Sequence, residues 1–100
     1  MGKLVRDRIP DIIRAEGREP ETRILADDEY VAALLAKVVE EAGELHDATT
    51  AEDRLAEAAD VYEVLLAVAE LCGASIEDVV RQADAKRQQR GGFGGGVWLE

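Results

Sequence analysis

Two long stretches with helical spacing, separated by only a few residues, constrain the fold of this chain most. The second stretch covers residues 51–71, opens on Thr50 and Asp53 in the pattern of a capping box, and ends near Gly73. The first covers residues 28–47 and has apolar side chains every three or four positions, as one face of a helix requires: Val31, Leu34, Leu35, Val38, Ala42 and Leu45. Because the connection is so short, the two helices are expected to pack antiparallel.

Weaker signals predict two more helices. Pro10 opens a short helix over Asp11–Glu16. Ser75 with Asp78 repeats the capping-box pattern and starts a helix that runs to about Gln89. Asp27 or Asp28 is expected to accept from free N–H groups at the start of the first long helix.

The last ten residues, 91–100, are too rich in glycine to continue a helix and are expected to form an extended tail. Residues 1–100 are therefore predicted to be a single all-α domain, an antiparallel bundle of about four helices with an extended Gly-rich C-terminal tail. Hydrophobic residues make up 47% of the chain, which is enough for a globular protein.

The formal net charge of −10 argues against a nucleic-acid partner, because it would repel a phosphate backbone. A protein this acidic can still bind phosphates where divalent cations lie between its carboxylates and the ligand.

The single cysteine, Cys72, allows no internal disulfide and is expected to lie in the core beside Val68 and Leu71. Neither a signal peptide nor a membrane-spanning stretch is recognisable. We therefore expect a soluble cytoplasmic protein with no membrane partner.

Two pairs of carboxylates lie on facing segments of the predicted hairpin. Glu41 with Glu44, and Glu57 with Asp60, are each three residues apart and so share a helix face. In an antiparallel pair both sets lie near the connecting turn. The four carboxylates are expected to converge.

A solvated surface is the ordinary explanation for acidic pairs, but the second helix argues against it. Its solvent stripe is Glu52, Glu63 and Glu70, whereas Glu57 and Asp60 project among apolar side chains. Buried carboxylates need a partner or a metal, and oxygen ligands favour Mg²⁺, with Mn²⁺ as its substitute. A di-iron site would need further histidines, and His46 is the only one and is expected at the surface.

Phosphates would also need cations. Lys37 lies one turn before Glu41, and Lys86 and Arg90 lie one turn apart on the last helix, so these three are the predicted phosphate-binding residues. Lys3, Arg6 and Arg8 form a second set of candidates.

The two acidic pairs form one motif: Glu41-x-x-Glu44, then twelve intervening residues, then Glu57-x-x-Asp60 followed by Val-Tyr-Glu-Val-Leu-Leu-Ala. This motif resembles that of the MazG-like and phosphoribosyl-ATP pyrophosphohydrolase family. The resemblance extends to Lys3-Leu-Val-Arg-Asp-Arg-Ile-Pro10, to Glu-Thr-Arg-Ile-Leu at 21–25 and to Arg90-Gly-Gly-Phe93, as in a small single-domain branch of that family.

The resemblance implies an enzyme that cleaves a nucleoside triphosphate between its α and β phosphates, with Glu41, Glu44, Glu57 and Asp60 as metal ligands. It gives Glu40 the role of an outer ligand or of orienting the attacking water, which makes Glu40 and Glu41 the candidate catalytic residues. Metals can supply the activated water, so no protein nucleophile is needed.

Two alternatives stay open: a phosphoribosyl-ATP pyrophosphohydrolase of histidine biosynthesis, and a non-catalytic module that binds a nucleotide or a protein. The expected partners are a nucleotide substrate and further copies of the chain, in a homodimer or a larger homo-oligomer.

Overall fold

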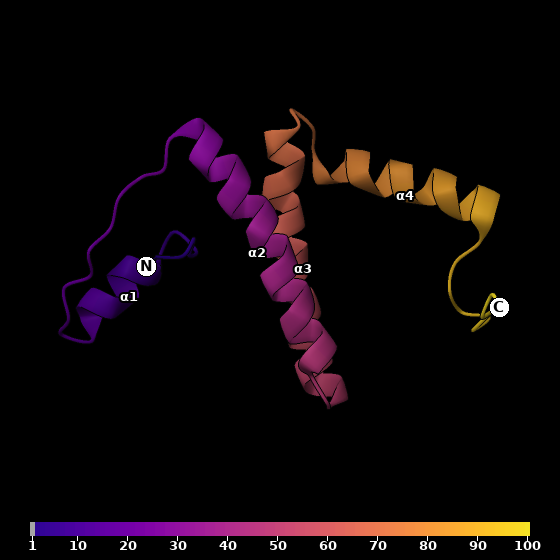
Figure 1. Cartoon of the computed structure of the whole chain (residues 1–100), viewed down its shortest axis with the longest axis horizontal. Coiled ribbons are helices and arrows are strands. Elements are labelled where there is room, and N and C mark those ends of the chain that lie inside the picture. Colours follow the sequence, from indigo (N-terminus) through magenta and orange to yellow (C-terminus); the bar gives the residue numbers. More distant parts are fainter. Residues whose placement is uncertain (1) are drawn as a thin grey trace. The chain divides into compact units, whose positions relative to one another are not determined.

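The computed structural model describes residues 2–100, and within them it contains four helices and no strand. These are α1 (Ile9–Ala15), α2 (Asp27–Asp47), α3 (Ala51–Leu71) and α4 (Ile76–Arg90), shown in Figure 1. After α4 the residues up to Glu100 form neither helix nor strand. The prediction of an all-α protein with about four helices and a C-terminal tail is confirmed.

The chain divides into two compact units, one ending at Val64 and the other covering Leu65–Glu100. The division falls inside α3, which contributes its first part to one unit and its last two turns to the other. That residues 1–100 form one domain therefore stays a prediction.

In the first unit, α2 and the beginning of α3 lie side by side as the predicted antiparallel pair (Figure 1). Three residues join them, and the side chain of Thr50 accepts a hydrogen bond from the backbone N–H of Asp53 at 3.0 Å. This hydrogen bond satisfies one of the free N–H groups in the first turn of α3. The helix has the predicted bounds.

The start of α2 is fixed by a side chain inside its first turn. Glu29 accepts the backbone N–H of Ala26 at 3.2 Å, and both terminal nitrogens of Arg23 hold the same carboxylate at 2.9 and 3.1 Å. Asp28 accepts the N–H of Glu29 at 3.0 Å, as expected of an aspartate near this end. The helix starts at Asp27, one residue before the predicted position.

The apolar face of α2 is narrower than predicted. Leu34 is buried at 3% exposure, and Val31, Val38 and Leu45 are half-buried, but Leu35 is 50% exposed and Ala42 is exposed as well. The inward positions 31, 34, 38, 41 and 45 alternate steps of three and four, which is the spacing of a seam between two helices. Glu41 occupies one position of this seam.

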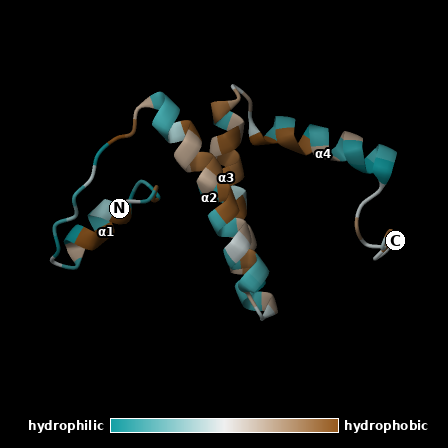
Figure 2. Ribbon diagram, in the orientation of Figure 1, coloured by the Kyte–Doolittle hydropathy of each residue, from teal (hydrophilic) through white to brown (hydrophobic). Residues whose placement is uncertain are grey.

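Hydrophilic residues gather on α2 and α3 near the turn that joins them, as Figure 2 shows. Beyond Leu34, the only buried apolar residue among residues 2–100 is Ala69. One copy of the chain therefore builds only a small core.

The two shorter helices end close to the predicted positions. Helix α1 begins at Ile9, two residues earlier than expected, with Pro10 in its first turn, and ends at Ala15. It stops before Gly17, whose φ of +87° suits glycine. In the second unit, the backbone N–H of Ser75 donates to Asp78 at 2.9 Å, and α4 extends to Arg90.

The expectation that Cys72 lies in the core is wrong. Cys72 is exposed, and its neighbour Leu71 is 38% exposed. Helix α3 ends at Leu71, so Cys72 belongs to the following turn, where the helical period no longer decides which way a side chain points.

No helix in residues 2–100 is both long enough and apolar enough to cross a bilayer.

Candidate metal centre

Three acidic side chains meet between α2 and the beginning of α3. Carboxylate oxygens of Glu41, Glu57 and Asp60 all lie within 4.8 Å of one another. Glu41 projects from the seam of α2, while Glu57 and Asp60 lie one turn apart on α3. We call this set the inner cluster, and each helix contributes to it as the sequence predicted.

Glu44 lies in a second, overlapping group. Oxygens of Glu40, Glu41 and Glu44 lie within 4.8 Å of one another, and both Glu40 and Glu44 are exposed. The four predicted ligands are therefore distributed over two groups of three that share Glu41. Their roles as metal ligands, and the role of Glu40 in catalysis, stay predictions.

Glu57 has an oxygen that the rest of the described chain does not satisfy. Its Oε2 atom is buried and has no hydrogen-bond partner in residues 2–100. A buried carboxylate oxygen without a partner costs free energy, and such atoms are rare in folded proteins. A small hard cation bound by carboxylates would satisfy it, so the inner cluster fits Mg²⁺.

Glu41 is the most strongly buried charged residue of the described chain, at 8% exposure. Burial raises the pKa of its carboxyl group above the usual 4.5, and the negative charges of Glu44 and Asp60 raise it further. Lys37 acts in the opposite direction but does not reverse the shift. The inner cluster is thus short of positive charge.

Lys37 is the cation that α2 itself supplies. Its Nζ atom lies 3.2 Å from Oε2 of Glu40 and 3.5 Å from Oε1 of Glu41, and its side chain is 17% exposed. Burial on its own lowers the pKa of Lys37, but the two carboxylates outweigh burial and raise it. The ammonium group is therefore charged and held between Glu40 and Glu41.

A second cation comes from the N-terminal segment. The Nη2 atom of Arg6 lies 2.6 Å from Oδ1 of Asp60, and its Nη1 atom lies 4.0 Å from Glu63, one turn further along α3. In the sequence, Arg6 was one of three lesser phosphate-binding candidates. No spacing rule connects residues 54 positions apart, so its contact with Asp60 was not predicted.

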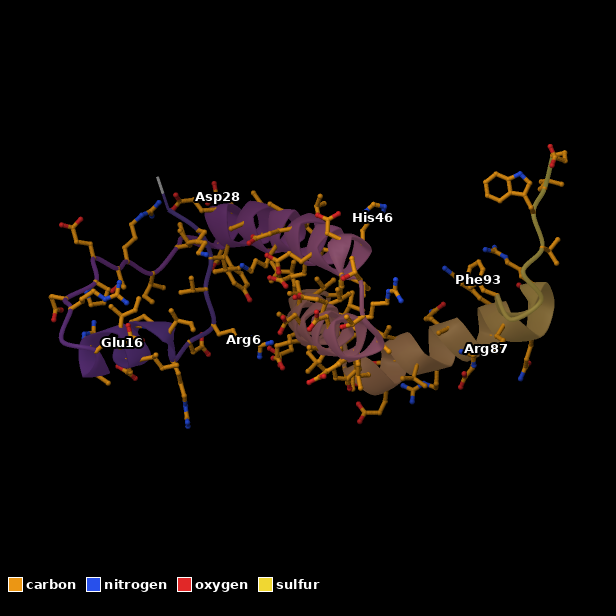
Figure 3. All side chains as sticks on the ribbon, turned by 90° about the horizontal axis from the view of Figure 1, so that it is seen from below. Arg6, Glu16, Asp28, His46, Arg87 and Phe93 are labelled. Carbon is orange, nitrogen blue, oxygen red and sulfur yellow. The ribbon has the colours of Figure 1, made fainter. Side chains whose placement is uncertain are left out.

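The other predicted site residues lie elsewhere. Lys86 and Arg90 are exposed on α4, in the second unit, and their binding of phosphate stays a prediction. His46 is at the exposed end of α2 and lies 3.0 Å from Asp47 (Figure 3). The expectation of a surface histidine is confirmed.

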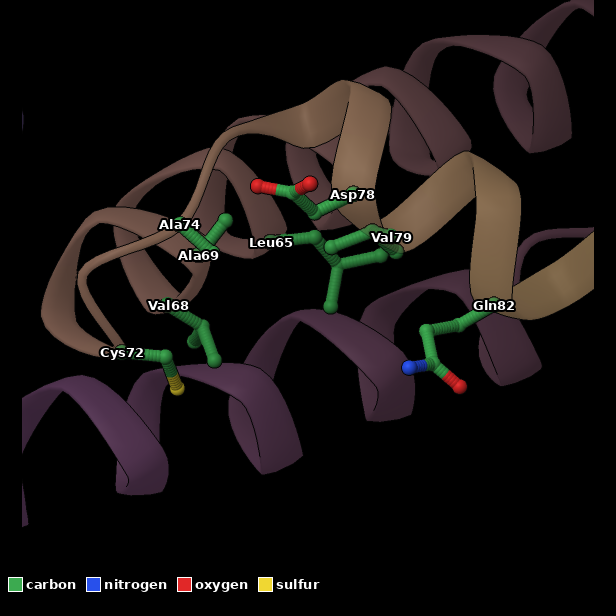
Figure 4. Close-up of a pocket in the computed structure, with 8 residues that line it drawn as sticks. All are labelled: Leu65, Val68, Ala69, Cys72, Ala74, Asp78, Val79 and Gln82. Atoms are coloured by element: carbon green, nitrogen blue, oxygen red, sulfur yellow. The ribbon is translucent and has the colours of Figure 1, made fainter.

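The second unit has a pocket of its own, of about 310 Å³ (Figure 4). Its one carboxylate, Asp78, is engaged by Ser75 and Arg81. The pocket offers a mostly apolar surface, quite unlike the inner cluster, and its lining is Leu65, Val68, Ala69, Cys72, Ala74, Asp78, Val79 and Gln82.

Comparison with known proteins gives two similarities. Residues 8–87 match the family described as Phosphoribosyl-ATP pyrophosphohydrolase. The chain is also 58% identical, over 55 residues, to an uncharacterized protein of Mycolicibacterium smegmatis (strain ATCC 700084 / mc(2)155); the match covers 55% of this chain and 56% of that protein. No solved structure matches. Since the family match covers most of the chain, including the helices that carry the inner cluster, the protein belongs to the phosphoribosyl-ATP pyrophosphohydrolase family.

Proposed function

We propose that this protein is a Mg²⁺-dependent nucleotide pyrophosphohydrolase that cleaves a nucleotide between its α and β phosphates, giving a monophosphate and pyrophosphate. The observation that carries the proposal is the unpartnered, buried Oε2 of Glu57 within the inner cluster. Membership of a pyrophosphohydrolase family supports the reaction class.

In this proposal Glu41, Glu57 and Asp60 hold the metal, and Glu44 adds a ligand from the exposed side. Bound Mg²⁺ supplies positive charge to the phosphates and lowers the pKa of the attacking water. Glu40, exposed and next to the cluster, orients that water or serves as an outer ligand. Lys37 keeps Glu40 and Glu41 in place through contacts of 3.2 and 3.5 Å, and its ammonium group faces the phosphates of the substrate. Lys86 and Arg90 are further phosphate-binding residues.

The substrate is a nucleoside triphosphate or a related nucleotide. The family description names phosphoribosyl-ATP, which makes that compound the first alternative substrate. The second alternative is a non-catalytic member of the family that binds a nucleotide or a protein. The presence of all four acidic residues of the motif favours an enzyme.

We also propose that two or more copies associate. A single copy has only Leu34 and Ala69 as buried apolar residues within the described part of the chain. In the first unit, Leu35 and Val39 of α2 are 50% and 73% exposed, and Leu55 of α3 is 74% exposed. Such apolar side chains on a small protein mark a surface that another copy covers.

The test is release of pyrophosphate in the presence of Mg²⁺ from a panel of canonical and modified nucleoside triphosphates and phosphoribosyl-ATP. Asp60→Asn removes one charge from the inner cluster, and Glu70→Gln removes one charge from the exposed side of the same helix. We expect turnover by the wild type and by Glu70→Gln, and loss of turnover in Asp60→Asn.

If no nucleotide of the panel gives metal-dependent pyrophosphate release, catalysis is contradicted. Equal losses of turnover in Asp60→Asn and Glu70→Gln would contradict the role of the inner cluster, because both changes remove one negative charge from α3.

A further inference from the structure

The contact between Arg6 and Asp60 joins a proposed metal ligand to a residue outside the region that matches the family, which begins at residue 8. It is a single hydrogen-bonded contact, from Nη2 of Arg6 to Oδ1 of Asp60. Both side chains remain accessible, at 57% and 41% exposure. An ion pair this exposed contributes little to stability, so it can be broken at low cost.

Arg6 competes with a metal for the carboxylate of Asp60. A metal ion in the inner cluster needs an oxygen of Asp60, and the guanidinium of Arg6 already neutralises that carboxylate. As both are cations, a metal at Asp60 also repels Arg6. Metal binding should therefore release Arg6 from Asp60.

The released guanidinium has a second use. The inner cluster carries three carboxylates, so one Mg²⁺ leaves it negative, and a polyphosphate adds more negative charge. Lys37 is held by two carboxylates and is 17% exposed, whereas Arg6 is the more exposed cation and precedes α1 in a segment without helix or strand. A planar guanidinium can bind two phosphate oxygens at once.

We propose that Arg6 is an exchangeable cation of this site: it pairs with Asp60 when the metal is absent and binds a substrate phosphate when the metal is present. The inference rests on the proposed function, since it requires both a metal at the inner cluster and a phosphorylated substrate. It makes Arg6 a substrate-binding residue supplied by the N-terminal segment, and it makes metal binding precede tight nucleotide binding.

The experiment measures metal and nucleotide separately in full-length Arg6→Met, Arg6→Lys and Arg14→Met. Arg14 is the matched control because it forms an exposed pair with Asp11, at 3.1 Å, away from the inner cluster. Binding of Mn²⁺ alone is followed by the electron paramagnetic resonance signal of the free ion. Pyrophosphate release with Mg²⁺ then gives KM and kcat for the best nucleotide.

We expect opposite effects on the two ligands. Arg6→Met should bind Mn²⁺ about twofold to fivefold more tightly than Arg14→Met, because the metal no longer displaces an ion pair. Its KM for the nucleotide should rise about tenfold or more, with a smaller change in kcat, because a charged hydrogen bond to phosphate is lost. In Arg6→Lys the KM should lie between those of the wild type and Arg6→Met, because lysine retains the positive charge. If Arg6 had a purely structural role, Arg6→Met would weaken the binding of Mn²⁺ and of the nucleotide together.

Unchanged Mn²⁺ affinity in Arg6→Met relative to Arg14→Met would overturn the exchange, and so would tighter Mn²⁺ binding with an unchanged KM. If the wild type bound no Mn²⁺ at all, the proposed function would fail and this inference with it. Metal binding by the wild type therefore separates the two failures.

Discussion

Replacing Glu41 by glutamine should stabilise the protein without metal and destabilise it relative to the wild type with metal. Glutamine has nearly the same shape and retains an oxygen that Lys37 can contact. The change therefore removes one negative charge from the inner cluster while leaving the packing of the α2 seam nearly unaltered.

The size of the effect follows from the distances. Repulsion between unit charges 4.8 Å apart, the upper limit within the inner cluster, is about 1 kcal/mol in water and about 3.5 kcal/mol at an effective dielectric constant of 20. Attraction to Lys37 at 3.5 Å is about 1.2 kcal/mol in water and about 5 kcal/mol at an effective dielectric constant of 20. Two repulsions, from Glu44 and Asp60, whose charges raise the pKa of Glu41 and whose oxygens lie within the same 4.8 Å, minus one attraction leave a gain of about 0.5–2 kcal/mol.

A gain of 1 kcal/mol corresponds to a rise in melting temperature of about 4–8 °C for a domain of this size. Mg²⁺ at 100 times its Kd would stabilise the wild type by about 2.7 kcal/mol, but it would stabilise Glu41→Gln much less because a ligand is gone. The order of the two stabilities should therefore reverse on adding Mg²⁺.

The assay is urea denaturation of the wild type, Glu41→Gln and Glu70→Gln, with and without Mg²⁺ at constant ionic strength. Glu70→Gln removes the same charge from an exposed position, so it measures the benefit of lowering the net charge of −10. If Glu41→Gln without metal were no more stable than Glu70→Gln, the repulsion at Glu41 would be contradicted. Equal stabilisation of all three proteins by Mg²⁺ would contradict Glu41 as a metal ligand.

Three further predictions concern the metal ligands, the apolar residues of α2 and the start of α4. Glu57→Gln should weaken Mn²⁺ binding by more than about tenfold, and the exposed Glu44→Gln should weaken it less; a Mn²⁺ titration with the reverse order would contradict the inner cluster. Leu34→Ala should lower the free energy of unfolding by about 2–5 kcal/mol. For Leu35→Ala, the loss of free energy of unfolding should grow with protein concentration, because copies of the wild type associate. Denaturation at several protein concentrations would contradict this if the loss in Leu35→Ala stayed constant. The pKa of Asp78 is below its usual 3.8 because of hydrogen bonds from Ser75, so its ionised form contributes full stability well above pH 3.8, and the contribution is lost as the pH falls below 3.8 through the lowered pKa. Asp78→Asn should lower the melting temperature at pH 7, and by progressively less as the pH falls below 3.8; a difference that stayed constant into acid would contradict the assignment.

Much of the fold could be predicted because the signals are local. The capping pattern of Thr50 and Asp53 gave the start of α3, and the helical period placed Glu57 and Asp60 on an inward face, as the structure confirms. Periodicity says less about where a face ends. It assigned Leu35 to the apolar face of α2, whereas the packed stripe is narrower and leaves it half exposed.

Contacts between segments far apart in the chain could not be predicted from the sequence. Arg6 reaches Asp60 because of how the N-terminal segment lies against α3, which no local pattern encodes. The sequence also treated Glu44 as equivalent to Glu41, although the α2 seam steps by four residues from position 41 to position 45 and leaves Glu44 exposed. Cys72 was misplaced because the helical period was continued past the last residue of α3.

A crystal structure of the protein with Mn²⁺, read through the anomalous scattering of the metal, tests most directly whether the inner cluster binds a metal ion. We expect an anomalous peak bound by oxygens of Glu41, Glu57 and Asp60, with Arg6 no longer on Asp60. Crystals that contain Mn²⁺ at other positions, with Arg6 still paired to Asp60 and no peak at the cluster, would contradict this expectation.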